Sequence, residues 1–118
     1  MPVFKTDDTQ AAGTVTTNLM TGSKFEFLPT NSVVSVYGAQ DTVANGLVEL
    51  DFTLGNVIVA DNLPLNKKAS AGEGPDRNRD LLAQGVGAAG DRIQLRTAEV
   101  DPTGAPVPFR VLVQINQL

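Results

Sequence analysis

Strict alternation between apolar and polar residues constrains the fold of this chain more than any other feature. It is clearest in the segment GLVELDFTLGNVIVAD, residues 46–61. A period of two places apolar side chains on one face of an extended chain and polar side chains on the other, which predicts a β-strand with one buried face. Gly55 and Asn56 interrupt the alternation, and glycine at the first central position favours a two-residue type II′ turn. The segment therefore predicts a β-hairpin.

The last third of the chain carries the same alternation in two runs, residues 92–97 and 109–116. Between the runs stands the tetrapeptide Asp-Pro-Thr-Gly, residues 101–104, whose residue types suit the successive positions of a β-turn. We therefore expect these two runs to form a second hairpin. The apolar positions of the alternating segments predict the core: Leu50, Phe52, Ile93, Leu95, Val111, Val113 and Ile115.

Shorter runs of strand-forming residues predict further strands at residues 14–21, 24–29, 31–40 and 80–86. Seven or eight short strands with evenly spaced turn residues are typical of an all-β protein, and we expect an antiparallel β-sandwich that is jelly-roll-like. The pattern leaves immunoglobulin-like and jelly-roll topologies open. A chain of 118 residues is long enough for one domain. We expect the sandwich to span residues 14–118, behind an N-terminal arm at residues 1–13.

The residue types that carry most enzyme chemistry are missing. The chain has no histidine and no cysteine, so it lacks the commonest general base near neutral pH, the commonest metal ligand and any thiolate nucleophile. Its net charge of −4 disfavours nucleic acid as a partner. No apolar run approaches the roughly 20 residues of a membrane-spanning helix. We therefore expect a protein that is not an enzyme, with no catalytic or cofactor-binding residue and no membrane span.

One short motif has the spacing of a calcium-binding loop. Asp76, Asn78 and Asp80 stand two residues apart, as the first ligands of an EF-hand do. Leu81 and Gly87 occupy the positions where that loop needs glycine and glutamate. The motif therefore predicts a charged loop and no metal site.

Two irregular segments are candidates for contacts with a partner. The polar N-terminal arm holds two apolar residues, which we expect to be buried on a neighbouring subunit; the alternative is a frayed terminus. The segment Asn66 to Asp80 is rich in glycine and in charges of both signs. We expect its cations to meet acidic groups on a neighbour, and the alternative is a solvated loop. The candidate assembly contacts are Val3, Phe4, Lys67, Lys68, Arg77 and Arg79.

Several apolar residues interrupt the polar faces of the expected strands. They are Val33, Ile58, Val107 and Leu112. A domain of this size has little core with which to cover both faces of its sheets, so these residues favour burial between subunits. We therefore expect a homo-oligomer, in particular a homotrimer, or a subunit bound to a lattice.

Two stretches resemble small β-rich virion or minor capsid proteins of bacterial viruses. They are GTVTTNLMTGSKFEFLP and GVGAAGDRIQLRTAEVDPTGAPVPFRVLVQIN. In those proteins a Gly-Asp-Arg-apolar-x-Leu strand, a turn with glycine and a terminal Val-x-Val-x-Ile strand close the sandwich. The matching positions here are Gly90, Asp91, Arg92, Ile93, Leu95, Val111, Val113 and Ile115.

This resemblance implies a structural virion subunit: a capsid decoration, cement or minor capsid protein. Its partners would be copies of itself and a major capsid protein, and it would be located in the virion after synthesis in the host cytoplasm. The resemblance implies no catalytic residue. The alternative is a glycan-binding module, such as a viral fibre tip or a carbohydrate-binding domain. Such sites stack sugars on aromatic rings, whereas only 5% of the residues here are aromatic and none is tryptophan.

Overall fold

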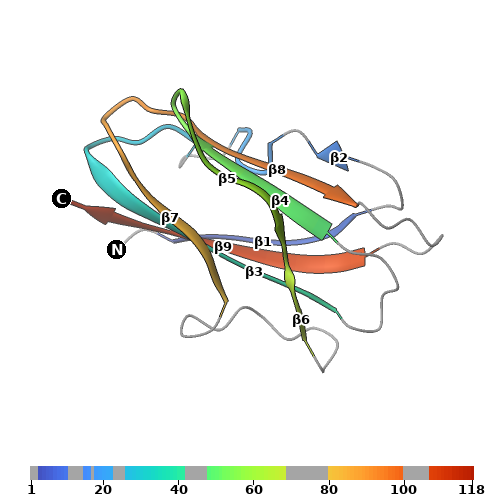
Figure 1. The fold of residues 1–118 in the computed structure, drawn as a ribbon. Helices are drawn as coiled ribbons and strands as arrows, with labels where there is room; N and C mark the ends of the chain where they lie inside the picture. Colours follow the sequence, from blue (N-terminus) through green and yellow to red (C-terminus); the bar gives the residue numbers. More distant parts are fainter. Residues whose placement is uncertain are drawn as a thin grey trace.

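The computed structural model describes residues 3–10, 15–16, 18–22, 26–41, 48–68, 80–99 and 107–118. For residues 3–10, 41, 67–68 and 107–108 it describes the backbone only. The regular structure of these residues is entirely β, and it forms two sheets that lie face to face (Figure 1). The expected all-β sandwich is confirmed.

The first sheet contains β1 (Val3–Gln10), β3 (Ser32–Asp41), β6 (Asn66–Lys68), β7 (Leu81–Gly87) and β9 (Val107–Gln117). The second contains β2 (Val15–Thr16), β4 (Val48–Leu54), β5 (Val57–Pro64) and β8 (Ile93–Glu99). In the first sheet the order is β1-β9-β3, and β6 and β7 share the far edge of β3. In the second sheet the order is β2-β8-β4-β5. All described pairs are antiparallel except β3 with β6.

The order in which the chain visits the two sheets is that of a jelly roll. The chain changes sheet between β1 and β2, between β2 and β3, and between β3 and β4. It then forms the β4–β5 hairpin and changes sheet again before β6, before β8 and before β9. Each sheet thus combines early and late strands, as wrapped double Greek keys do. The choice between immunoglobulin-like and jelly-roll topologies is therefore decided in favour of the jelly roll.

The hairpin between β4 and β5 is confirmed. Leu54 stands opposite Val57, which leaves Gly55 and Asn56 as a two-residue loop. Gly55 has a φ of 57°, whereas Asn56 does not have a positive φ. A positive φ at the first central position alone is the geometry of a type II′ turn.

The prediction of a second hairpin is wrong. β8 pairs with β2 and β4 in the second sheet, whereas β9 pairs with β1 and β3 in the first. Each of these strands has one buried face, so its alternation fits a hairpin and a crossing between facing sheets equally well. The pattern fixes which residues point inward but not which strand lies alongside. The predicted turn at residues 101–104 lies outside the described residues.

The other predicted strands have mixed outcomes. Residues 31–40 and 80–86 match β3 and β7 closely. Of the strand expected at residues 14–21, the described residues show β2, Val15–Thr16, and a turn that begins at residue 19. Of the run 24–29, the described residues show a single bridge between Phe27 and Arg92. Two strands that the sequence does not predict, β1 and β6, raise the number of strands in the described residues above the expected seven or eight.

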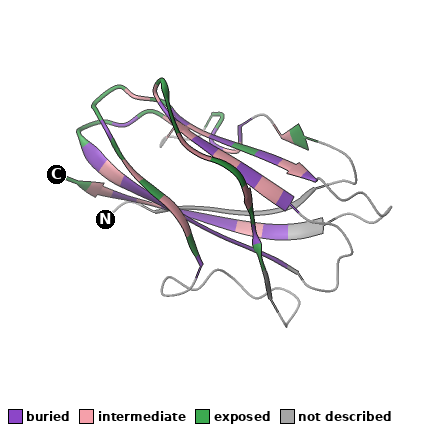
Figure 2. Cartoon of the chain, in the orientation of Figure 1, coloured by how far each residue is buried: buried purple, intermediate pink, exposed green. Residues whose placement is uncertain are grey.

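The core lies between the two sheets (Figure 2). The β4 strand alternates buried and half-buried residues along its whole length, as its sequence predicts. All seven predicted core residues are buried. The core also contains Met20 and Leu28, which come from the irregular connection between β2 and β3. Alternation in the sequence does not identify these two residues as core, because neither of them lies in a strand.

Candidate assembly surface

The described residues of the first sheet include four of the six predicted assembly contacts. Val3 and Phe4 lie in β1, opposite Gln114 and Val113 of β9. Lys67 and Lys68 lie in β6, opposite Gln40 and Asp41 of β3. β9 separates β1 from β3, so the two pairs belong to different parts of one sheet. Their side chains are not described, and Arg77 and Arg79 lie outside the described residues. Their contact roles remain predictions.

The expected boundaries of the two irregular segments differ from the structure. Residues 3–10 pair with β9 along the whole of β1, so this part of the expected N-terminal arm is a strand of the sandwich. The sequence does not predict this strand because most of its residues are polar, and an edge strand needs few apolar residues. Residues 66–68 of the expected loop likewise form β6, which pairs with β3 next to the stretch of β3 that β7 covers.

Leu112 does not lie open to a partner, although it interrupts a polar face. It stands opposite Tyr37 on the face of the first sheet that points away from the second sheet. Leu112 is 6% exposed and Tyr37 is 8% exposed. The chain itself therefore buries this break in the alternation. Ile58, by contrast, is 70% exposed and remains available for contact.

An unpaired strand edge invites pairing with another chain unless something blocks it. In the second sheet, β2 covers only one end of the outer edge of β8. The connection after β2 covers more of it: Leu19 N–H donates to the Leu95 carbonyl at 2.9 Å, and Ile93 N–H donates to the Glu26 carbonyl at 2.7 Å. The edge of β8 is thus covered by backbone that is not itself a regular strand.

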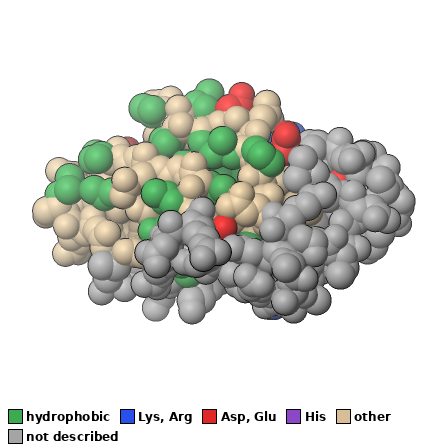
Figure 3. All heavy atoms as spheres, turned by 60° about the horizontal axis from the view of Figure 1, so that its bottom comes forward, with side chains coloured by type: hydrophobic (Ala, Val, Ile, Leu, Met, Phe, Trp, Pro, Cys, Tyr) green, Lys and Arg blue, Asp and Glu red, His purple; other side chains and the backbone are tan. Residues whose placement is uncertain are grey.

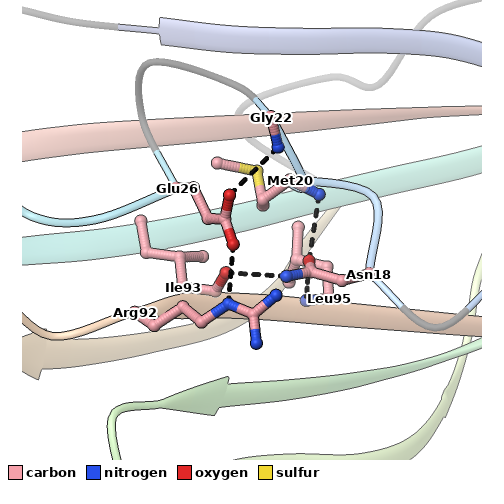
Figure 4. Close-up of polar contacts among 7 residues, drawn as sticks. All are labelled: Asn18, Met20, Gly22, Glu26, Arg92, Ile93 and Leu95. Carbon is pink, nitrogen blue, oxygen red and sulfur yellow. Dashed lines mark hydrogen bonds and ion pairs between the residues drawn. The ribbon is translucent and has the colours of Figure 1, made fainter.

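Asn18 fills the gap in this cover with its side chain (Figure 4). Its Oδ1 accepts hydrogen bonds from Leu95 N at 3.1 Å and from Met20 N at 2.9 Å. Its Nδ2 donates to the Ile93 carbonyl at 3.5 Å. The amide therefore offers β8 one donor and one acceptor, as a neighbouring strand would. Asn18 is 8% exposed, so these backbone groups have little access to water.

The connection after β2, with its described residues 18–22 and 26–28, is called the β8 clamp because it holds the outer edge of β8. Glu26 and Arg92 form an ion pair at one end of this clamp (Figure 4). Arg92 Nε donates to Glu26 Oε2 at 2.7 Å, and Gly22 N–H donates to Glu26 Oε1 at 3.0 Å. The Gly22 hydrogen bond, together with that from Arg92, holds the pKa of Glu26 below its usual value. The carboxylate form is therefore the one that fastens the connection to β8.

We expect Asn18→Ala to destabilise the fold by about 2–3 kcal/mol, because it leaves the buried N–H groups of Met20 and Leu95 without their acceptor. Chemical denaturation of the two proteins measures this difference. Asn31→Ala is the matched control: Asn31 Oδ1 accepts one hydrogen bond, from Ala89 N, but in an exposed turn where water can replace it. Equal costs for the two substitutions would contradict the role assigned to Asn18.

A charged cluster lies on the outer face of the second sheet, at Asp51, Asp61 and Arg96. Asp51 Oδ2 accepts from Arg96 Nη1 at 2.9 Å, and Asp51 Oδ1 accepts from Asn62 N–H at 2.7 Å. Partial burial raises the pKa of Asp51, but these hydrogen bonds outweigh it and leave the pKa lowered. A hydrogen bond to Asp51 and the charge of that carboxylate raise the pKa of Asp61. Arg96 offsets one of the two carboxylate charges, and the described residues contain no group of three potential metal ligands.

We expect Asp51→Asn to lower the pKa of Asp61 toward its usual value, because the neighbouring negative charge is removed. Titration of the Asp61 carboxyl group by NMR measures this change. In the parent protein, ionisation of Asp61 beside the Asp51 carboxylate lowers the free energy of unfolding. This loss of stability develops as the pH rises through the raised pKa of Asp61, and it is absent at low pH, where Asp61 is protonated. An Asp61 pKa that stays raised in Asp51→Asn would contradict the pairing.

Exposed apolar side chains are the remaining feature of the surface. Those on strands are Val15, Val57, Ile58, Leu81 and Val86, and Phe27 and Leu118 lie outside the strands. Figure 3 shows hydrophobic groups spread over the described part of one face, with few charged groups among them. Aliphatic side chains of this kind suit contact with protein rather than catalysis.

Of the calcium-like motif, Asp76 and Asn78 lie outside the described residues, and only Asp80 is described. Asp80 of the calcium-like motif is buried, and its Oδ1 accepts from Asn66 Nδ2 at 2.7 Å. No helix in the described part of the chain is long and apolar enough to cross a membrane. Comparisons with protein-family models, with curated proteins and with solved structures found no match.

Proposed function

We propose that this chain is a structural subunit of a bacterial virus particle: a capsid decoration, cement or minor capsid protein. It acts by symmetric self-assembly, as a homotrimer in solution or on the particle, and by contacts with a major capsid protein. Its location is the virion. It performs no catalysis and binds no cofactor or nucleic acid.

The observation that carries this proposal is the wrapped jelly-roll order of the two sheets. Jelly rolls are the architecture of many viral capsid subunits, and also of lectins and cupins. Because one fold hosts unrelated functions, the surface has to separate these classes. The chain has no histidine with which to build a cupin-type metal site. Among the described residues the exposed large apolar side chains are aliphatic except for Phe27, which favours contacts between protein surfaces.

The alternative, a glycan-binding module, is favoured by one observation. Phe27 is 56% exposed in the β8 clamp, and an exposed aromatic ring can stack on a sugar. Tyr37 does not join it, because Tyr37 lies buried in the first sheet. A lone ring with no second aromatic residue described nearby offers a sugar little binding energy.

Quantitative mass spectrometry of purified virus particles tests the proposal. We expect the chain in a fixed stoichiometry to the major capsid protein, retained after a high-salt wash because apolar contacts resist screening. A glycan array with the parent protein and Phe27→Ala tests the alternative. If the chain is absent from particles and binds a sugar in a way that depends on Phe27, the glycan-binding module replaces the virion subunit as the favoured function.

A further inference from the structure

The edges of the two sheets differ in how they are protected against pairing. β1 carries Lys5, Asp7 and Asp8, and charges on an edge discourage pairing. The connection after β2 covers the edge of β8. β5 has two register shifts against β4, a left-handed residue at Asn62 with a φ of 55°, and Pro64 at its end. All three edges therefore carry a device that opposes a further strand.

From Ala83 to Gly87, β7 carries none of these devices. Its sequence, LLAQGVG, has no charged residue and no proline over seven positions. One of its edges pairs with β3 from Ser32 to Tyr37, with a single shift near the Leu81 end. No strand in the described part of the chain pairs with its other edge. The stretch from Ala83 to Gly87 is therefore a regular strand whose outward backbone donors and acceptors have no strand partner among the described residues.

The side chains of β7 suit a close neighbour. Val86 is 67% exposed and Leu81 is 48% exposed. On the inward face, a Cβ added to Gly85 would lie 3.1 Å from the side chains of Leu54 and Val59, so the strand packs closely on β5. This contact brings the exposed residues of the β4–β5 hairpin, Val57 and Ile58, to the same side of the sandwich.

We propose that β7 pairs with β7 of a second copy of this chain, antiparallel and about a twofold axis. An edge with free backbone groups selects an extended strand as its occupant. Pairing with the opposite edge, β1, would bring three charged residues against an uncharged strand. Self-pairing brings none, and a twofold contact needs only one self-complementary edge. The pairing of β7 with β7 continues the first sheet from one copy into the next and covers Val86 in both.

This twofold contact is distinct from the threefold contact of the proposed trimer. A lattice needs more than one kind of contact, and the two would act together in a particle. Only the purpose of the pairing rests on the proposed function. The pairing itself is tested on the purified chain, so its failure leaves the particle measurement unaffected.

The first test is sedimentation equilibrium of the full chain and of two lysine variants. We expect concentration-dependent association of the parent, weakened about tenfold or more by Val86→Lys, because two like charges meet near the axis. Thr21→Lys is the control: Thr21 is exposed in the connection after β2, at the edge of the other sheet, and its substitution should leave association within about twofold. Matching thermal melts show that both variants remain folded.

A parent that stays monomeric up to roughly millimolar concentration would overturn the proposal. Equal weakening by the two lysine variants would do so as well. A second test uses the absence of native cysteine. Under mild oxidation Val86→Cys should form a disulfide-linked dimer, and Thr21→Cys should not. A mixture of Val86→Cys and Lys5→Cys that forms the mixed dimer in preference would show β1 as the occupant and would also overturn the proposal.

Discussion

Deletion of residues 1–10 should abolish cooperative unfolding of the isolated protein. β1 pairs with β9 at eight successive positions, and β9 is a central strand that also supports β3. Without β1, the edge of β9 is left open beside the core residues Val111 and Val113. A domain of this size has only about 5–15 kcal/mol of total stability, and the loss of a whole strand consumes most of it.

Denaturant titration of the truncated chain, followed by circular dichroism, measures this loss. A synthetic peptide of residues 1–12 should restore the transition if β1 acts as a strand of the sheet. A truncated protein that unfolds with the same midpoint and the same denaturant dependence as the parent would show that residues 1–10 form an independent arm. The same deletion cannot serve as a test of assembly, because it removes part of the fold.

Phe52→Ala should cost about 3–5 kcal/mol of stability, the usual range for a large buried ring. Phe52 is 0% exposed and is among the largest side chains of the core. It lies in β4, opposite Leu95 of β8 and Ala60 of β5, so its removal leaves a cavity that three strands line. Chemical denaturation of the two proteins measures the difference.

The control for Phe52→Ala is Thr53→Ala, the next residue of the same strand. Thr53 points to the outer face, where a substitution usually changes stability by about 0.5 kcal/mol or less. If the two substitutions cost the same, β4 does not bury the face that its alternation and the structure assign.

The sequence predicts those parts of the fold that local rules determine. The alternation of β4 and β8 fixes which face is buried, so Leu50, Phe52, Ile93 and Leu95 are identified correctly. The β4–β5 hairpin follows from the conformational freedom of Gly55 at a position with a positive φ. In each case the neighbours along the chain supply the physical reason.

Long-range choices are less accessible to such rules. The partner of β9 depends on β1 and β3, which are distant in sequence, so the turn before β9 was not enough to decide its sheet. Asn18 gives no sequence signal for its role, because its side chain replaces a strand only where β8 happens to pass. Exposed edges such as β7 are also invisible until the order of the strands is known.

The candidate assembly surface shows the same division. The sequence identifies apolar interruptions, and the structure separates Leu112, which the chain buries, from Ile58, which stays exposed. It also places Val3 and Phe4 in a strand rather than in a free arm. Val86 lies within an expected strand, and only the order of the strands shows that it flanks an unprotected edge.

The most direct test of a structural role is the mass of the purified protein and of its assemblies, measured by native mass spectrometry across a range of concentrations, with and without virus particles. We predict discrete symmetric oligomers of the free chain and a fixed number of copies on each particle. A chain that remains a monomer at every concentration and binds no particle would contradict the account.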